Sequence, residues 1–458
     1  METMHHTVSA GVIYLFTAVL AAMIIALAME EKLHAKKSII VGVFAVGSLL
    51  LASFFGLIPF GDVIVPGGVH LHLPVYIEAV DWEVIAIIIG SSLFVDVTSR
   101  SGLFSWIAIK LTKASTGDPL KLLWYYGSMT VIFSAVLNNV TAMIIVGSLT
   151  GVSLNKLERD NLLLGFLLTE GLLTNVGGLL TLISSVPNII VGNTAGISFV
   201  TFFLKASPYV LLATVATLLL GAKLFKIQSL KSESEQIAAA DLIKSFDEND
   251  GVRSQNFFWF SAIILVAFIL AIATTSITPV IRDLGMGFVA MTFAVIVLTR
   301  FKHDVNEFYQ AIDWDLILFF MSLFVVINVM EHAQVLALIG QGVGWLIGDG
   351  DSLLGTGSLL VSSALFSSVT DNIPLSAMLA KILSNLNIAN ESPLWWSVVF
   401  GANLGGNITP IGSASTLVAA TIIHKHQLKM SFVDFVKAAS PFALMQIVMA
   451  SVYVLVFL

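Results

Sequence analysis

Long apolar runs constrain this chain more than any other feature of its sequence. Val8–Ala28 and Ile39–Leu57 are two examples, and each is long enough to cross a hydrocarbon core of about 30 Å. The apolar residues do not alternate with polar ones, which is typical of helices rather than of barrel strands. In lipid, the backbone must satisfy its hydrogen bonds internally. The runs therefore predict an all-α polytopic membrane protein.

The composition excludes several other classes of protein. Only 11% of the 458 residues are charged and 57% are hydrophobic, whereas a soluble domain carries about 25% charged residues. The net charge of −7 gives no indication of nucleic-acid binding, and the sequence has no cysteine for disulfides or thiolate metal sites. No Gly-x-x-x-x-Gly-Lys loop occurs, which argues against ATP-driven transport. We expect a transporter that is not an enzyme, with the lipid bilayer as its surroundings and no cofactor beyond a coupling ion.

A polar motif occurs twice, once in each half of the chain. Ser134–Thr141 reappears in altered form as Ser367–Pro374. Each copy is followed by a glycine-rich polar break inside an apolar stretch, at Asn175–Gly178 and at Asn403–Asn407. Paired interruptions at corresponding positions of two halves are typical of the binding sites of secondary transporters.

The spacing of these landmarks predicts an internal repeat. Offsets of 232, 233 and 228 residues relate Asp81 to Asp313, Asn139 to Asn372, and Gly177 to Gly405. Each half holds five predicted full spans, and an odd number of spans inverts the second copy relative to the first. The sequence thus predicts two inverted-topology repeats of five transmembrane helices plus one re-entrant hairpin each, with broken helices at the midplane.

The repeats are expected at 1–222 and 256–458, joined by a cytoplasmic linker at 223–255. The predicted unbroken spans lie near 8–28, 38–57, 83–98, 205–222, 256–276, 284–299, 315–331 and 433–457. The predicted re-entrant hairpins cover 120–150 and 353–383, and the predicted broken helices cover 161–192 and 394–423. Amphipathic stretches at 101–116 and 335–348 precede the two hairpins.

The distribution of basic residues supports this topology. With the N-terminus outside, 18 of the 22 Lys and Arg residues fall on predicted cytoplasmic segments, and the predicted external loop 58–80 contains none. This follows the positive-inside rule. This topology requires each hairpin to enter and leave the membrane on the same side. We expect an integral, multi-pass protein of the plasma (inner) membrane.

The hairpin tips and the breaks hold the candidate binding residues. Helix ends exposed at membrane depth offer free N–H and carbonyl groups, and Asn, Ser and Thr add neutral donors and acceptors. The candidates for substrate or ion binding are Asn138, Asn139, Thr141, Asn175, Gly177, Ser184, Ser185, Asn188, Asp371, Asn372, Asn403, Asn407, Thr409, Ser413 and Ser415. The alternative is that such residues only allow close helix packing and interhelical hydrogen bonds.

Carboxylates inside a membrane are costly and therefore informative. Asp371 at the second tip and Glu170 in the middle of a span are the candidate proton carriers. Asn139, Asp371 and Asn372 form a candidate Na⁺ site. The alternative for Glu170 is a carboxyl group with a purely structural hydrogen bond.

These motifs resemble those of the ion transporter superfamily, whose members share a citrate-transporter-like domain. The similar segments are Ser134–Thr141, Glu170 with Thr174–Gly178, Ser367–Pro374 and Gly401–Ser415. They are most similar to the branch of arsenite permeases, D-type sodium–proton antiporters and the melanosomal P-protein. The resemblance implies outer scaffold helices, two re-entrant hairpins, an elevator-like motion and a homodimer. The antiporters carry Asp-Asn at the first tip, where this chain has Asn138-Asn139.

Two functions stay open on this reading of the sequence. The first is Na⁺/H⁺ antiport, with Asp371 binding Na⁺ and H⁺ alternately. The second is Na⁺- or H⁺-coupled transport of a small anion, either a carboxylate or an oxyanion such as arsenite, held by helix N–H groups and neutral side chains. A channel or a membrane scaffold is a third class, which the repeated broken helices disfavour.

Overall fold

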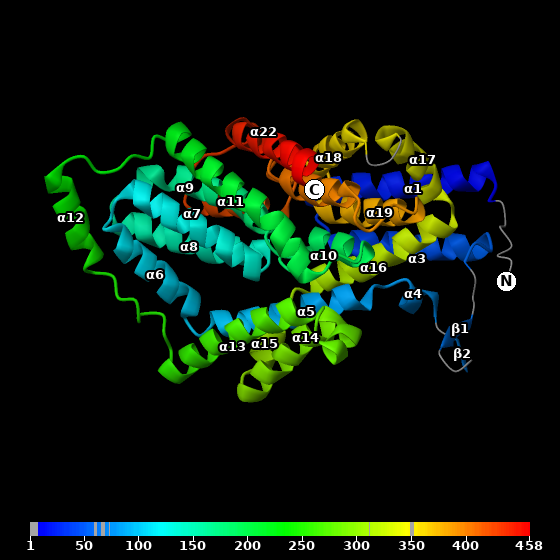
Figure 1. Ribbon diagram of the computed structural model, residues 1–458, viewed down its shortest axis with the longest axis horizontal. Coiled ribbons are helices and arrows are strands. Elements are labelled where there is room, and N and C mark those ends of the chain that lie inside the picture. Colours follow the sequence, from blue (N-terminus) through cyan, green and yellow to red (C-terminus); the bar gives the residue numbers. More distant parts are fainter. Residues whose placement is uncertain (1–7, 59–61, 66–68, 73, 311, 349–351) are drawn as a thin grey trace.

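A computed structural model describes residues 8–58, 62–65, 69–72, 74–310, 312–348 and 352–458 (Figure 1). Within these residues, eight helices are long and apolar enough to span a membrane. They are α1 (Ala10–Ala28), α3 (Lys37–Phe54), α5 (Trp82–Ser99), α11 (Phe199–Leu224), α13 (Gln255–Thr274), α14 (Pro279–Arg300), α16 (Trp314–His332) and α22 (Phe432–Phe457). Large apolar side chains such as Leu50 and Leu211 are exposed on them, as lipid-facing residues would be. The prediction of a helical, multi-span membrane protein is confirmed.

Two further helix pairs occupy the predicted hairpins. The first pair is α7 (Pro119–Val136) and α8 (Asn139–Lys156), and the second is α18 (Leu353–Ser367) and α19 (Asn372–Asn385). The duplicated motif starts the second helix of each pair. The Asn138 side chain accepts a hydrogen bond from the Thr141 amide at 2.8 Å, and Asp371 accepts one from the Ile373 amide at 3.0 Å. Both residues are therefore N-caps, which stabilise a helix start.

Each predicted broken span consists of two short helices with an unwound segment between them. The first comprises α9 (Leu163–Gly177) and α10 (Val186–Thr194), and the second α20 (Pro393–Gly405) and α21 (Ala414–Lys425). Close packing explains why the last residue of α9 and the last residue of α20 are both glycine. A Cβ at Gly177 would lie 2.7 Å from the Val131 Cα, and a Cβ at Gly405 would lie 2.7 Å from the Ala364 Cα. Gly177, predicted to bind a ligand, thus contacts the α7 backbone.

The shorter elements include one departure from the expected all-helical chain. The predicted loop 58–80 contains an antiparallel pair, β1 (Asp62–Val65) and β2 (Val69–His72), followed by α4 (Val75–Glu78). Sequence reasoning missed these strands because it searched for apolar spans. The amphipathic stretches form α6 (Leu103–Ser115) and α17 (Val335–Ile347). The remaining short helices are α2 (Glu30–Leu33), η1 (Asp160–Leu162) and α15 (Val305–Gln310).

The polar segment 223–255 contains a helix, α12 (Glu233–Ile243), at the edge of the molecule (Figure 1). Its role as a cytoplasmic linker between two repeats stays a prediction. Glu248 pairs with Lys110 at 2.8 Å and with Lys113. These two lysines hold the pKa of the Glu248 carboxyl at about 2. The ion pairs attach the linker to the first half.

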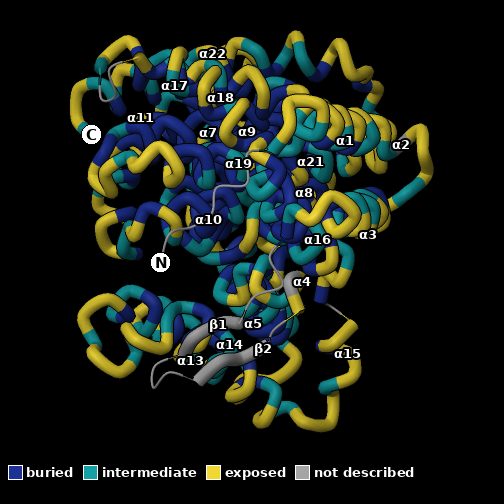
Figure 2. The backbone as a smooth tube through the Cα atoms, turned by 90° about the vertical axis from the view of Figure 1, so that its right-hand side faces the viewer, coloured by how far each residue is buried: buried dark blue, intermediate teal, exposed yellow. Residues whose placement is uncertain are grey.

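The two halves pack against each other in a reciprocal pattern. Helix α5 of the first half lies along α14 of the second, and α3 of the first lies along α16 of the second. Likewise, α10 packs on α19 and α20, while α21 packs on α8 and α9. Figure 2 shows the buried residues concentrated around α7, α9, α10 and α18, whereas α1 and α3 carry many exposed residues. The broken helices therefore lie in the interior, enclosed by elements of both halves.

The contact between α5 and α14 predicts a stability difference between two glycines. A Cβ at Gly90 would lie 2.5 Å from the Ala290 carbonyl carbon, whereas a Cβ at Gly47 would meet nothing within 4 Å. We expect Gly90→Ala to lower the free energy of unfolding by about 1–3 kcal/mol through overpacking. Gly47→Ala is the control and should be neutral or slightly stabilising. Unfolding of the detergent-solubilised variants measures this, and equal stabilities would contradict the described packing.

Candidate functional site

Reciprocal hydrogen bonds join the two broken helices at their centres. Asn175, near the end of α9, donates from Nδ2 to the Ser413 Oγ at 2.9 Å. Ser185 donates from Oγ to Oδ1 of Asn403, near the end of α20, at 2.7 Å. The residue offsets 403 − 175 and 413 − 185 both equal 228. Each asparagine thus bonds the serine that precedes the second helix of the opposite broken span.

A second set of equivalent bonds ties each hairpin to its own broken helix. The serines that begin the duplicated motif, Ser134 and Ser367, donate to the carbonyl oxygens of Thr174 and Ala402, each at 2.6 Å. The threonines of the unwound segments, Thr181 and Thr409, donate back to the carbonyl oxygens of Ala135 and Ser368, also at 2.6 Å. Thr409, predicted to bind a ligand, therefore donates its hydroxyl hydrogen to the hairpin backbone, at the Ser368 carbonyl oxygen.

The first polar cluster, called the Asn175 cluster, consists of Asn139, Asn175, Asn407, Ser413 and Ser415. The Asn175 Oδ1 accepts from the Asn139 Nδ2 at 3.3 Å and from the Ser415 Oγ at 2.9 Å. The Asn175 Nδ2 also donates to the Asn407 Oδ1 at 2.8 Å. All of these residues except Asn139 are buried. The structure thus brings five of the predicted site residues together, from the first hairpin tip and from both broken helices.

Two residues that the sequence reading missed extend this cluster. Asn407 donates from Nδ2 to the Gln446 Oε1 at 2.8 Å, and Gln446 donates from Nε2 to the Thr217 Oγ1 at 2.9 Å. Gln446 is completely buried in α22. Its amide within the apolar run of α22 was the available signal, because a buried amide needs hydrogen-bond partners.

The second polar cluster, called the Asn403 cluster, consists of Ser185, Asn188 and Asn403. Asn403 donates from Nδ2 to the Asn188 Oδ1 at 2.9 Å. Asn188 donates to the carbonyl oxygens of Gly178 and Thr181 at 2.6 and 2.9 Å, and Ser184 also donates to the Gly178 carbonyl, at 2.6 Å. These side chains satisfy the carbonyl groups that lose their helical partners where α9 ends.

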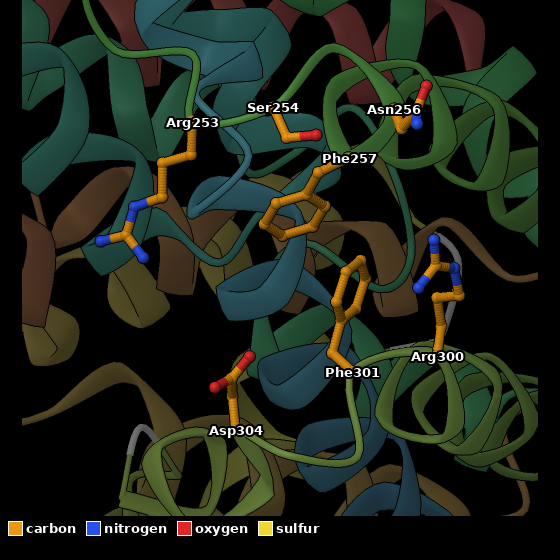
Figure 3. Close-up of a pocket in the computed structure, with 7 residues that line it drawn as sticks. All are labelled: Arg253, Ser254, Asn256, Phe257, Arg300, Phe301 and Asp304. Atoms are coloured by element: carbon orange, nitrogen blue, oxygen red, sulfur yellow. The ribbon is translucent and has the colours of Figure 1, made fainter.

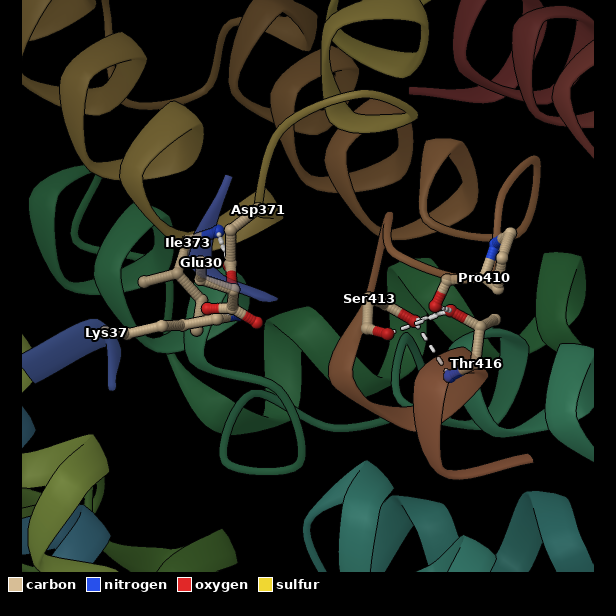
Figure 4. Close-up of polar contacts among 7 residues, drawn as sticks. All are labelled: Glu30, Lys37, Asp371, Ile373, Pro410, Ser413 and Thr416. Carbon is tan, nitrogen blue, oxygen red and sulfur yellow. Dashed lines mark hydrogen bonds and ion pairs between the residues drawn. The ribbon is translucent and has the colours of Figure 1, made fainter. Parts of the chain in front are cut away.

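The start of α10 differs from the start of α21 in its capping. Ser413 caps α21 by accepting the Thr416 amide at 3.3 Å (Figure 4). Ser185 makes no side-chain cap on α10, and its hydroxyl group donates to Asn403 instead. Free amides at a helix N-terminus favour an anion. The uncapped start of α10 therefore adds a positive end to the neutral Asn403 cluster.

Asp371 lies apart from both polar clusters. Its Oδ2 forms an ion pair with the Lys37 Nζ at 2.5 Å, and only 11% of its side chain is exposed. Figure 4 shows Lys37 and Asp371 together, separate from Ser413 and Thr416. Of the other two residues of the predicted Na⁺ site, Asn139 belongs to the Asn175 cluster and Asn372 is buried at the start of α19. This conformation does not gather the three residues in one hydrogen-bonded cluster, and their role in Na⁺ binding stays a prediction.

The first hairpin tip is more open than the second. Asn138 is exposed and Thr141 is partly buried. The Asn138 side chain caps α8 through the Thr141 amide. These two predicted site residues lie at the tip but make no side-chain hydrogen bond to either cluster among the described residues.

Glu170 is completely buried in α9. Its Oε1 accepts from the Thr150 Oγ1 at 2.7 Å, whereas its Oε2 has no hydrogen-bond partner among the described residues. A carboxylate with an unpaired oxygen is costly inside a membrane protein. This environment favours the protonated form of the Glu170 carboxyl group. Its role as a proton carrier stays a prediction.

The structure also contains a cavity of about 370 Å³ at the start of α13 and the end of α14. Arg253, Ser254, Asn256, Phe257, Arg300, Phe301 and Asp304 line it (Figure 3). None of the predicted binding residues is among them. In Figure 3 the two arginines lie on opposite sides of the phenylalanine pair, so they do not converge on one anion.

Sequence comparison identifies relatives across most of the chain. The protein-family model described as "Citrate transporter" (CitMHS) matches residues 24–401. The "46 kDa membrane protein" of Mycobacterium leprae is 29% identical over 383 residues, covering 82% of this chain and 86% of that protein. The P protein of Mus musculus is 26% identical over 455 residues, covering 83% of this chain and 54% of that protein. The resemblance expected from the motifs is confirmed.

Two solved structures share the fold. The YdaH transporter of Alcanivorax borkumensis superposes with a TM-score of 0.61 at 13% identity, covering 92% of this chain and 98% of that chain. MtrF of Neisseria gonorrhoeae, described as illuminating a class of antimetabolite efflux pumps, superposes with a TM-score of 0.56 at 13% identity. It covers 98% of this chain and 95% of that chain. At this identity the likeness concerns the fold alone.

The Asn175 cluster predicts a large effect of truncating its central residue. Asn175→Ala leaves hydrogen-bonding groups of Asn407, Ser413 and Ser415 buried without their partner. We expect a loss of about 1–3 kcal/mol in the free energy of unfolding, because buried polar groups without partners are costly. Asn155→Ala is the matched control on the exposed end of α8 and should change stability by less than about 0.5 kcal/mol. A loss no greater than that of the control would show that the cluster does not stabilise the fold.

Proposed function

The chain belongs to the citrate transporter family, and we propose that the substrate of this secondary transporter is a small carboxylate anion, moved together with Na⁺ or H⁺. The observation that carries the proposal is the chemistry where the helices break. The Asn403 cluster supplies neutral amide and hydroxyl groups beside the uncapped start of α10. The side-chain hydrogens of Asn403, Asn188 and Ser185 are bonded within the protein. The free amides at the start of α10 are therefore the groups that donate to a carboxylate, without requiring an arginine.

The charge around the breaks also supports an anion. The Asn175 and Asn403 clusters contain only asparagine and serine. Asp371, the one acid at a hairpin tip, is paired with Lys37 at 2.5 Å. An anion would therefore meet little repulsion there. The family description, citrate transporter, agrees with this class of substrate.

Na⁺/H⁺ antiport is the second candidate, and one specific observation favours it. Glu170 is a completely buried carboxyl with one oxygen unpartnered among the described residues. A protonatable group of this kind inside the membrane suits a proton carrier. Its place in α9, the helix that carries Asn175, would couple protonation to the polar clusters.

Alternating access between inverted repeats is the mechanism we propose. It is supported by the reciprocal bonds of Asn175 with Ser413 and of Ser185 with Asn403, which have equal sequence offsets. The packing of α10 on helices of the second half, and of α21 on helices of the first half, also supports it. Transport by rocking or sliding of one part against another requires a binding site at the interface of the repeats. The two clusters lie at that interface.

The inverted topology predicts opposite sides for two equivalent tyrosines. Tyr76 lies between α3 and α5, and Tyr309 lies between α14 and α16; both are exposed. Tyr76→Cys and Tyr309→Cys place single thiols in a chain without native cysteine. A membrane-impermeant maleimide added to intact cells should label the first variant and should label the second only after permeabilisation. Labelling of both from the same side would rule out inversion.

Transport in proteoliposomes tests the substrate class. We expect radiolabelled citrate or a dicarboxylate to accumulate when a Na⁺ or H⁺ gradient is imposed. Asn403→Ala should lower the initial rate by about tenfold, since it removes the partner of Ser185 and Asn188 at the start of α10, and leaving buried polar groups without a partner costs about 1–3 kcal/mol. Asn155→Ala, away from the breaks, should transport as the parent does.

The same vesicles separate the two candidate functions. Proton movement driven by a Na⁺ gradient without any carboxylate, and lost in Glu170→Gln, would establish antiport and exclude the carboxylate proposal. Carboxylate uptake that requires the gradient, with no proton movement in its absence, would establish the first candidate.

A further inference from the structure

The ion pair between Lys37 and Asp371 joins two parts of the molecule that are distant in sequence. Lys37 starts α3, and Asp371 caps α19 at the tip of the second hairpin. Their charged atoms lie 2.5 Å apart across 334 residues of sequence. The Lys37 side chain extends toward Asp371 in Figure 4. The pair is therefore the point at which the hairpin tip is held against α3.

Further acidic groups lie near the Lys37 ammonium group. The Glu30 Oε2 lies 4.0 Å from the Lys37 Nζ. Asp315 of α16 accepts a hydrogen bond from Ser38, next to Lys37 in α3. The other helices that pack on α19, namely α10, α17, α18 and α20, contain no charged residue. At the far end of α16, Glu331 is already paired with Lys381 at 3.0 Å. Lys37 is thus the cation that balances Asp371.

The first hairpin lacks this arrangement. Its cap is Asn138, a neutral and exposed residue in the position equivalent to Asp371. A hairpin with a neutral tip can move away from its neighbours without needing a counter-charge. By contrast, the Asp371 side chain is only 11% exposed, and removing the partner of a buried charge is strongly unfavourable. Movement of the second hairpin away from α3 is therefore costly unless a cation or a proton replaces Lys37 at Asp371.

We propose that Lys37 is a built-in counter-cation of Asp371 and that a Na⁺ ion from solution takes its place when the hairpin of α18 and α19 leaves α3. This rests on the proposed function, because it gives cation coupling a definite position on the second hairpin. In one state the lysine neutralises the carboxylate. In the other state a dissolved Na⁺ does so, assisted by oxygen atoms at the tip. The lysine and the Na⁺ compete for one site.

Na⁺ binding to the purified full-length chain tests this competition. Radioactive Na⁺ is bound at pH 8, with choline as the inert replacement cation. Lys37→Gln removes the competing charge, so Na⁺ should bind about tenfold tighter or more than in the parent chain, an increment of about 1.4 kcal/mol. The gain should disappear in the Lys37→Gln/Asp371→Asn double variant. Lys36→Gln, at the exposed neighbouring lysine, should leave Na⁺ affinity unchanged.

Two further variants guard against a purely structural effect. Lys37→Ala gives a second neutral replacement, and Lys37→Arg keeps the charge and should bind Na⁺ as weakly as the parent chain. All variants are compared only where gel filtration and thermal unfolding show an intact fold. Na⁺ binding no tighter in Lys37→Gln and Lys37→Ala than in the parent would overturn the proposal. Tight binding that persists without Asp371 would overturn it as well.

The binding measurement is independent of the transported anion because it contains no carboxylate. Tighter Na⁺ binding in Lys37→Gln together with no carboxylate uptake by the parent chain would refute the substrate class and support the counter-cation. Uptake of carboxylate by the parent chain, with no gain in Na⁺ affinity in Lys37→Gln, would support the substrate class and refute the counter-cation.

Discussion

The loss of backbone hydrogen bonds where a helix breaks inside a membrane protein is the constraint on which the rest of this structure depends. No water is at hand in lipid to satisfy the freed groups. Here the side chains of Asn188 and Ser184 bond the Gly178 carbonyl, and Thr181 and Thr409 tie the unwound segments to the hairpins. Many of the polar side chains at the breaks therefore stabilise the unwound segments. The remaining polar groups, centred on Asn175 and Asn403, form the site at which we propose that a substrate binds.

The reciprocal contacts explain why neither half is expected to form the site alone. Asn175 needs Ser413, and Asn403 needs Ser185, so each broken helix completes the other. The close approach of Gly177 to Val131 and of Gly405 to Ala364 fixes each broken helix on its own hairpin. Each hairpin and its broken helix are thus coupled by backbone packing and hydrogen bonds, while side-chain hydrogen bonds join the two broken helices to each other. Motion between the halves would therefore alter the clusters first.

Local patterns predicted the helices and the breaks, but they could not predict which side chains meet. Apolar length located the spans, and glycine with asparagine located the ends of α9 and α20. The partnership of Asp371 with Lys37 crosses 334 residues, and no local pattern encodes it. Gln446 and Thr217 were missed for the same reason, since their role appears only when α11 and α22 lie beside the second break. The strands β1 and β2 were missed because a short hairpin in a loop leaves no apolar signature.

The difference between the two tips gives the nearly symmetric arrangement a direction. If both hairpin tips were neutral and equivalent, moving either hairpin would cost the same free energy. Here Asn138 is exposed and neutral, whereas Asp371 is partly buried and paired with Lys37. Because a largely enclosed carboxylate is costly to leave without a counter-charge, we propose that only the second hairpin couples its movement to a cation. In this proposal the neutral clusters at the breaks hold the anion, so that one tip supplies the coupling and the shared centre supplies the recognition.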